Sequence, residues 1–90
     1  MQKYNYLILE IKEFINQNDL LSLQQYFQQL DLNDTTIPWD FVYQKIYLHS
    51  CLKKNKEIKE WFESLISLFN PISQSAIKHT FHYGNYLMNK

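Results

Sequence analysis

The chain has 90 residues, which suits one small domain, and 46% of them are hydrophobic, so it can build a core. Nine lysines balance nine carboxylates, and there is no arginine. A nucleic-acid-binding protein normally has a basic excess and uses arginine forks on phosphate or guanine. Direct binding to nucleic acid is therefore disfavoured.

The chain carries no sign of export or of a membrane span. Its single cysteine, Cys51, cannot form an internal disulfide, which indicates a reducing compartment. No apolar run approaches the roughly 18 residues that suggest a membrane-spanning helix. The charged N-terminal segment lacks a small-residue cleavage site and is typical of a helix of the mature protein. We expect one cytoplasmic domain over residues 1–90.

The apolar residues recur at spacings of three and four, which predicts helices. One glycine and two prolines leave little material for β-hairpins, so we expect an all-α fold. The first helix has the apolar stripe Tyr4, Leu7, Ile8, Ile11 and Ile15. Asn18 or Asp19 can cap a second helix. The stripe of that helix is Leu20, Leu23, Phe27 and Leu30.

The third helix follows the loop DLNDTT. We expect it to open near Thr36 and Ile37 and to end at about Leu52. Pro38 and Asp40 then lie in its first turn, where a missing amide N–H and a negative charge both suit a helix N-terminus.

Two further helices follow. Asn55 can cap a fourth helix. Its apolar stripe is Ile58, Trp61, Phe62, Leu65 and Phe69. Asn70 and Pro71 are suited to the cap and first position of a fifth helix. Gly84 should end that helix and leave residues 85–90 as a stub.

The chain also contains an internal echo. A shift of 35 residues aligns the stripes of the second and fourth helices, with Leu23 on Ile58 and Phe27 on Phe62. A shift of 30 residues aligns the third and fifth helices: Ile46 on Ala76, His49 on His79, Ser50 on Thr80 and Asn55 on Asn85. The pattern predicts about two and a half helix–turn–helix units. An irregular bundle of four or five helices is the alternative.

The segment IYLHSCLKKNKEIKEWF, residues 46–62, resembles divergent ankyrin repeats, particularly the Trp-containing repeats of large DNA viruses. Ser50 and Cys51 match the small residues of the first helix of such a repeat. The apolar face of its second helix is matched by Ile58, Trp61 and Phe62. AIKHTFHYGNYLM resembles the same pattern, with Gly84 as the turn glycine. The usual Thr-Pro-Leu-His opening is absent.

Few residues suggest chemistry. His49, Cys51, His79 and His82 are of metal-ligating types, but their spacing does not match a four-ligand site, and we expect no metal or cofactor. His49 and Cys51 lie two residues apart on different sides of a helix, so His49 is poorly placed to activate the thiol. No acid–base or nucleophile constellation is present, and we expect no enzymatic activity.

The resemblance implies a non-catalytic protein–protein interaction module that binds through the first helices and turns of its units. The expected partner-binding residues are Trp39, Tyr43, Leu48, His49, Leu52, Lys53, Lys78, His79, His82 and Tyr83. Trp39 and Tyr43 are included in this set because they are aromatic residues one turn apart near a helix start, and interfaces are enriched in aromatic residues. The other eight lie at outward positions of the third and fifth helices.

Two alternatives remain open. One is a small helical inhibitor or decoy, of viral or mobile-element type, that blocks an enzyme or defence complex. The other is a structural subunit of a larger assembly. Whichever function holds, we expect the C-terminal segment, with Tyr86, Leu87 and Met88 to bury, to dock on another protein or on a second copy.

Overall fold

The computed structural model describes residues 3–69 and 71–90, and the regular structure within these ranges is entirely helical. The predicted all-α class is confirmed. The elements are α1 (Lys3–Asn16), α2 (Leu20–Gln28), α3 (Trp39–Leu52), α4 (Lys56–Ser64), the 3-10 helix η1 (Leu65–Leu68) and α5 (Pro71–Asn89).

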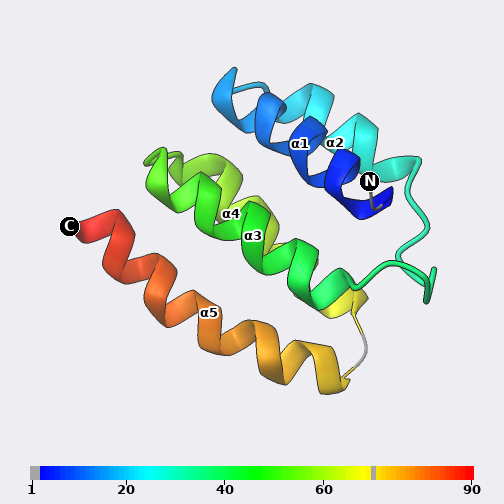
Figure 1. Ribbon diagram of the computed structural model, residues 1–90. Coiled ribbons are helices and arrows are strands. Elements are labelled where there is room, and N and C mark those ends of the chain that lie inside the picture. Colours follow the sequence, from blue (N-terminus) through cyan, green and yellow to red (C-terminus); the bar gives the residue numbers. More distant parts are fainter. Residues whose placement is uncertain (1–2, 70) are drawn as a thin grey trace.

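The helices form two layers (Figure 1). α1, α3 and α5 lie side by side and run in the same direction, and we call this layer the first row. α2 and α4 run in the opposite direction behind α1 and α3, so each pair forms a helical hairpin. Because α3 lies between α1 and α5 and also packs on α4, half of its residues are buried.

The two hairpins repeat one backbone pattern. Each bound of α3 and α4 lies 36 residues after the matching bound of α1 and α2. Both turns contain a residue with positive φ, Asn18 at 57° and Lys54 at 58°. The next residues, Asp19 and Asn55, each accept a hydrogen bond from the backbone N–H three positions on, at 3.1 and 3.0 Å. These two predicted caps are therefore confirmed.

The predicted offset of 35 residues describes the side chains but not the backbone. Leu23 and Phe27 of α2 and Ile58 and Phe62 of α4 are all buried, as that alignment requires. The helix bounds, however, are offset by 36. The first buried residue of α2, Leu23, therefore lies four residues after its cap, whereas the first buried residue of α4, Ile58, lies three residues after its cap.

The predicted turn at Gly84 is wrong, and with it the alignment of Asn55 on Asn85. α5 runs without a break through Gly84 to Asn89. A Cβ added at Gly84 would lie 2.9 Å from the Cys51 sulfur and would overlap the Tyr47 ring. The glycine is needed because α5 approaches α3 closely there, and not because the chain turns.

The other boundaries differ by smaller amounts. α3 begins at Trp39, with Pro38 as the residue before it and Asp40 in its first turn as predicted. α4 ends at Ser64, five residues before its expected end, and the chain continues as η1. Asn70, the predicted cap of α5, lies outside the described residues.

Aromatic rings join the central helix to its neighbours. Tyr43 and Tyr47 of α3 stack with centroids 6.0 Å apart. Tyr43 and Phe69 pack edge to face, with ring centroids 5.3 Å apart. The ring centroids of Tyr47 and Phe81 of α5 are 4.9 Å apart. The high aromatic content therefore serves the core of a short chain, where each ring buries a large apolar area.

Candidate interaction surfaces

The residues expected to bind a partner lie in three different places. Trp39 and Tyr43 are in the core, which contradicts their prediction as partner-binding residues. Leu48, His49 and Leu52 lie on α3, and Lys53 is exposed just after that helix. Lys78, His79, His82 and Tyr83 are exposed on α5.

Trp39 and Tyr43 are buried because the start of α3 is enclosed on several sides. Their side chains are 8% and 1% exposed. The Tyr43 hydroxyl donates a hydrogen bond to the backbone carbonyl of Phe62, and burial together with the nearby Glu63 carboxylate raises the pKa of Tyr43. Sequence spacing could not reveal this enclosure, since it depends on α4 folding back over α3.

An exposed apolar surface lies on the outer side of α3. Phe41, Lys45, Leu48 and Leu52 follow one another at spacings of four, three and four, so they share a helix face. Leu52 is 61% exposed and Phe41 is 44% exposed, whereas Leu48 is half-buried. The Lys45 ammonium lies 5.4 Å from the centroid of the Phe41 ring.

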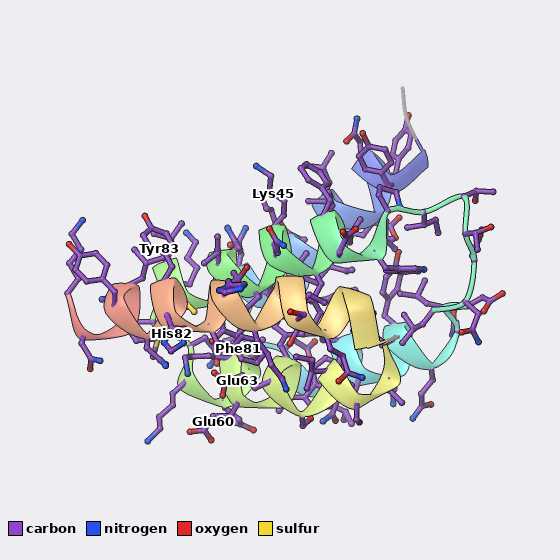
Figure 2. The ribbon with its side chains drawn as sticks, turned by 90° about the horizontal axis from the view of Figure 1, so that it is seen from below. Lys45, Glu60, Glu63, Phe81, His82 and Tyr83 are labelled. Atoms are coloured by element: carbon purple, nitrogen blue, oxygen red, sulfur yellow. The ribbon has the colours of Figure 1, made fainter. Side chains whose placement is uncertain are left out.

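Tyr83 of α5 extends this surface. Figure 2 shows that Tyr83 and Lys45 point to the same side of the molecule. We call Phe41, Lys45, Leu48, Leu52 and Tyr83 the first-row face. Phe41 and Lys45 were not among the predicted partner-binding residues, although their helical spacing from Leu48 would have indicated them.

His49 connects two helices of the first row. Its Nε2 lies 2.7 Å from Asn16 Oδ1 at the end of α1. Burial lowers the pKa of His49, and the ammonium groups of Lys12 and Lys53 lower it further. His49 is therefore held as a neutral contact between α1 and α3, and it is less available to a partner than the sequence analysis expected.

The exposed residues of α5 face two directions. His82 points away from Tyr83 and toward the side where α4 lies (Figure 2). Tyr83 stacks on Tyr86 with ring centroids 6.1 Å apart. Leu87 is buried and Met88 packs partly against the core, so only Tyr86 of the three C-terminal apolar residues remains exposed.

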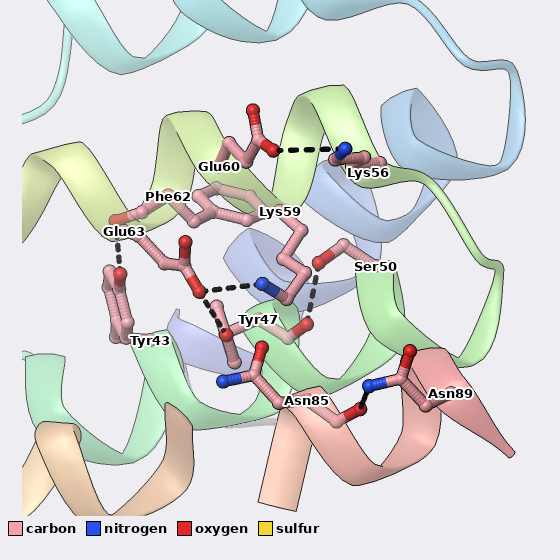
Figure 3. A network of polar contacts seen from close by, with 10 residues as sticks. All are labelled: Tyr43, Tyr47, Ser50, Lys56, Lys59, Glu60, Phe62, Glu63, Asn85 and Asn89. Atoms are coloured by element: carbon pink, nitrogen blue, oxygen red, sulfur yellow. Dashed lines mark hydrogen bonds and ion pairs between the residues drawn. The ribbon is translucent and has the colours of Figure 1, made fainter. Parts of the chain in front are cut away.

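A partly buried polar network joins α3 to α4 (Figure 3). The Tyr47 hydroxyl donates to Glu63 Oε2 at 2.7 Å, and the Lys59 ammonium lies 2.8 Å from the same oxygen. Lys59 is only 8% exposed. The burial of Lys59 could not be predicted, because a lysine inside a run of charged residues is typical of a solvated helix face.

The surroundings of Tyr47 and Cys51 favour the protonated form of each side chain. Burial and the hydrogen bond to Glu63 raise the pKa of Tyr47, so its phenol stays a proton-bearing donor. Burial likewise raises the pKa of the Cys51 thiol, which disfavours the reactive thiolate. Within residues 3–69 and 71–90, no three His, Cys, Asp or Glu side chains gather closely enough to hold a metal ion.

Neither the helices nor comparison with known proteins identifies a function. Over the described ranges, no helix has the length and apolar character needed to cross a membrane. No protein-family model matches the chain, and neither a curated protein nor a solved structure matches it. The first-row face and the outer side of α5 are therefore the features on which a functional inference can rest.

Proposed function

We propose that this protein is a non-catalytic protein-binding module that recognises its partner through the first-row face. The observation that carries this proposal is the exposure of Phe41 and Leu52 on the helix face that carries Lys45, with the exposed Tyr83 pointing to the same side as Lys45 (Figure 2). Neighbouring apolar and aromatic side chains that stay in water favour a protein interface over a purely solvated surface.

The support beneath this face is rigid. α3 is fixed to α4 by the network of Tyr47, Lys59 and Glu63, and to α5 by the close contact at Gly84. A preorganised helix face loses little conformational entropy on binding, so more of the contact energy is available for affinity.

An ankyrin-like stack is the finer part of the proposal. The two hairpins of equal length and the parallel first row support it, since stacked helical hairpins are the plan of such repeats. The offset of 36 residues is close to the ankyrin period of about 33. α5 departs from that plan in its length: the same offset would give a helix over residues 75–88, whereas α5 begins four residues earlier and ends one residue later.

The test compares partner capture by the wild-type protein with capture by Leu52→Asp. A carboxylate placed in the middle of an apolar interface must be desolvated on binding, so we expect affinity to fall at least about tenfold, equivalent to about 1.4 kcal/mol. The measurement is affinity capture from the native extract with quantitative mass spectrometry, followed by titration of the captured partner with each purified variant.

Leu21→Asp is the matched control. Leu21 is an equally exposed leucine, but it lies on α2, in the layer behind the first row. The proposal requires that the control keeps the partner which Leu52→Asp loses. If both variants retain it, or both lose it while their helical circular dichroism is unchanged, the first-row face is not the binding surface.

A further inference from the structure

Charged residues are distributed unevenly along the sequence, although the formal net charge of the whole chain is zero. Residues 1–40, which include α1 and α2, contain six of the nine carboxylates and two of the nine lysines. Residues 41–90 contain the remaining three carboxylates and seven lysines. The two parts of the chain therefore have opposite net charge, although α1 itself carries two lysines as well as two glutamates, and three of the six carboxylates lie in residues 31–40.

α1 lies at one edge of the first row, and its outer side is exposed. Five exposed residues lie along it, at successive spacings of three, one, three and four: Tyr6, Leu9, Glu10, Glu13 and Gln17. Two apolar side chains, each 58% exposed, thus stand beside two carboxylates. A shallow surface hollow lies along this stripe and is lined by Glu10, Glu13, Phe14 and Gln17.

α5 lies at the opposite edge of the first row, and its outer side is also exposed. Its exposed stripe has the same spacing pattern: Ser75, Lys78, His79, His82 and Tyr86. α5 carries no carboxylate anywhere along its length. Lys78 and the two imidazoles can donate hydrogen bonds to carboxylates, and the exposed Tyr86 ring offers an apolar contact.

The two stripes match in length and direction. Each spans eleven residue steps, which is about 16 Å along a helix. α1 and α5 also run in the same direction at opposite edges of the first row (Figure 1). A second copy placed beside the first would therefore bring an acidic stripe against a basic one, with the helices parallel as they are within the row.

We propose that the protein associates head to tail with copies of itself, with α1 of one copy lying against the outer side of α5 of the next. This contact joins two different surfaces, so it does not close on itself as a two-fold dimer does, and it extends the first row across copies. It leaves the first-row face uncovered, and it does not depend on the partner-binding function proposed above.

The first experiment is sedimentation velocity of the full chain across a range of protein and salt concentrations. We expect a weight-average mass that rises with protein concentration beyond that of a dimer at low salt. The rise should shrink at high salt, because exposed ion pairs are screened. A monomer of 11.0 kDa under every condition would overturn the proposal.

The second experiment uses the charge reversals Glu13→Lys and Lys78→Glu, one on each stripe. Each variant alone faces like charges across the contact, so we expect its association constant to fall about tenfold. Mixing the two variants restores opposite charges across the contact and should restore association. Equal helical circular dichroism of both variants and the wild type serves as the folding control.

The pattern of results distinguishes the possible contacts. If only Lys78→Glu weakened association, the copies would pair through α5 on both sides, and the head-to-tail contact would be wrong. If only Glu13→Lys did so, they would pair through α1. Neither variant alters a residue of the first-row face, so their capture of the partner tests the proposed function separately.

Discussion

At the scale of single residues, His49 links stability to pH. Its folded-state pKa is lowered from the ordinary value of 6.5, mainly by burial, with contributions from Lys12 and Lys53. The unfolded chain therefore binds a proton at a higher pH than the folded chain does. The contribution of His49 to the free energy of unfolding is fully present above about pH 6.5 and declines as the pH falls below it.

The variant His49→Gln isolates this effect, since an amide can still hydrogen-bond to Asn16 but does not titrate. We expect urea unfolding to show the wild type losing stability relative to His49→Gln as the pH falls through 6.5. Parallel pH profiles of the two proteins would contradict the assignment, because the other titratable groups are common to both.

At the scale of elements, the contact between α3 and α5 depends on Gly84. Gly84→Ala improves the helix propensity of α5 by about 1 kcal/mol. The new methyl group, however, would overlap the Tyr47 ring and press on the Cys51 sulfur, so α5 must move away from α3. Overpacking of this kind costs about 1–3 kcal/mol, and we expect a net loss of stability.

Urea unfolding of Gly84→Ala measures this loss, with Asn85→Ala as the control. Asn85 is the next residue of the same helix and is exposed, so its replacement gains helix propensity without a clash. We expect the two substitutions to shift the unfolding midpoint in opposite directions. A midpoint for Gly84→Ala at or above that of the wild type would mean that α5 has room for a side chain.

The same glycine shows how far the sequence could predict the elements. Helix starts were predictable where a side chain acts locally: Asp19 and Asn55 each cap the backbone N–H three residues on. Gly84 was misread because its role depends on α3, thirty-odd residues away. Local rules treat a glycine inside a helical pattern as a break, whereas a contact between helices can require one.

Burial at the site was harder to predict than the helices. Leu52 and Tyr83 were correctly placed outside the core, because helical periodicity separates the two sides of a helix. Trp39 and Tyr43 were misplaced, since α3 is covered on more than one side and one apolar stripe does not describe it. The burial of Lys59 was not predictable for a related reason: its partner Glu63 also accepts a hydrogen bond from Tyr47 of α3, a contact that exists only in the folded chain.

At the scale of the whole molecule, α3 packs against α1, α4 and α5. Stacked repeats can in principle unfold unit by unit, because each unit contacts only the next. With only two hairpins and a shared central helix, neither hairpin keeps its buried face without α3. The chain should therefore unfold as one cooperative unit.

Two tryptophans allow this cooperativity to be measured. Trp39 begins α3, and Trp61 lies in α4 with its ring 5.3 Å from that of Phe27 in α2. Trp61→Phe leaves the first probe and Trp39→Phe leaves the second. For each variant we expect the tryptophan fluorescence and the far-ultraviolet circular dichroism to report the same urea midpoint. Fluorescence transitions that separate from the circular dichroism would instead show that the hairpins unfold independently, and that the central position of α3 does not couple them.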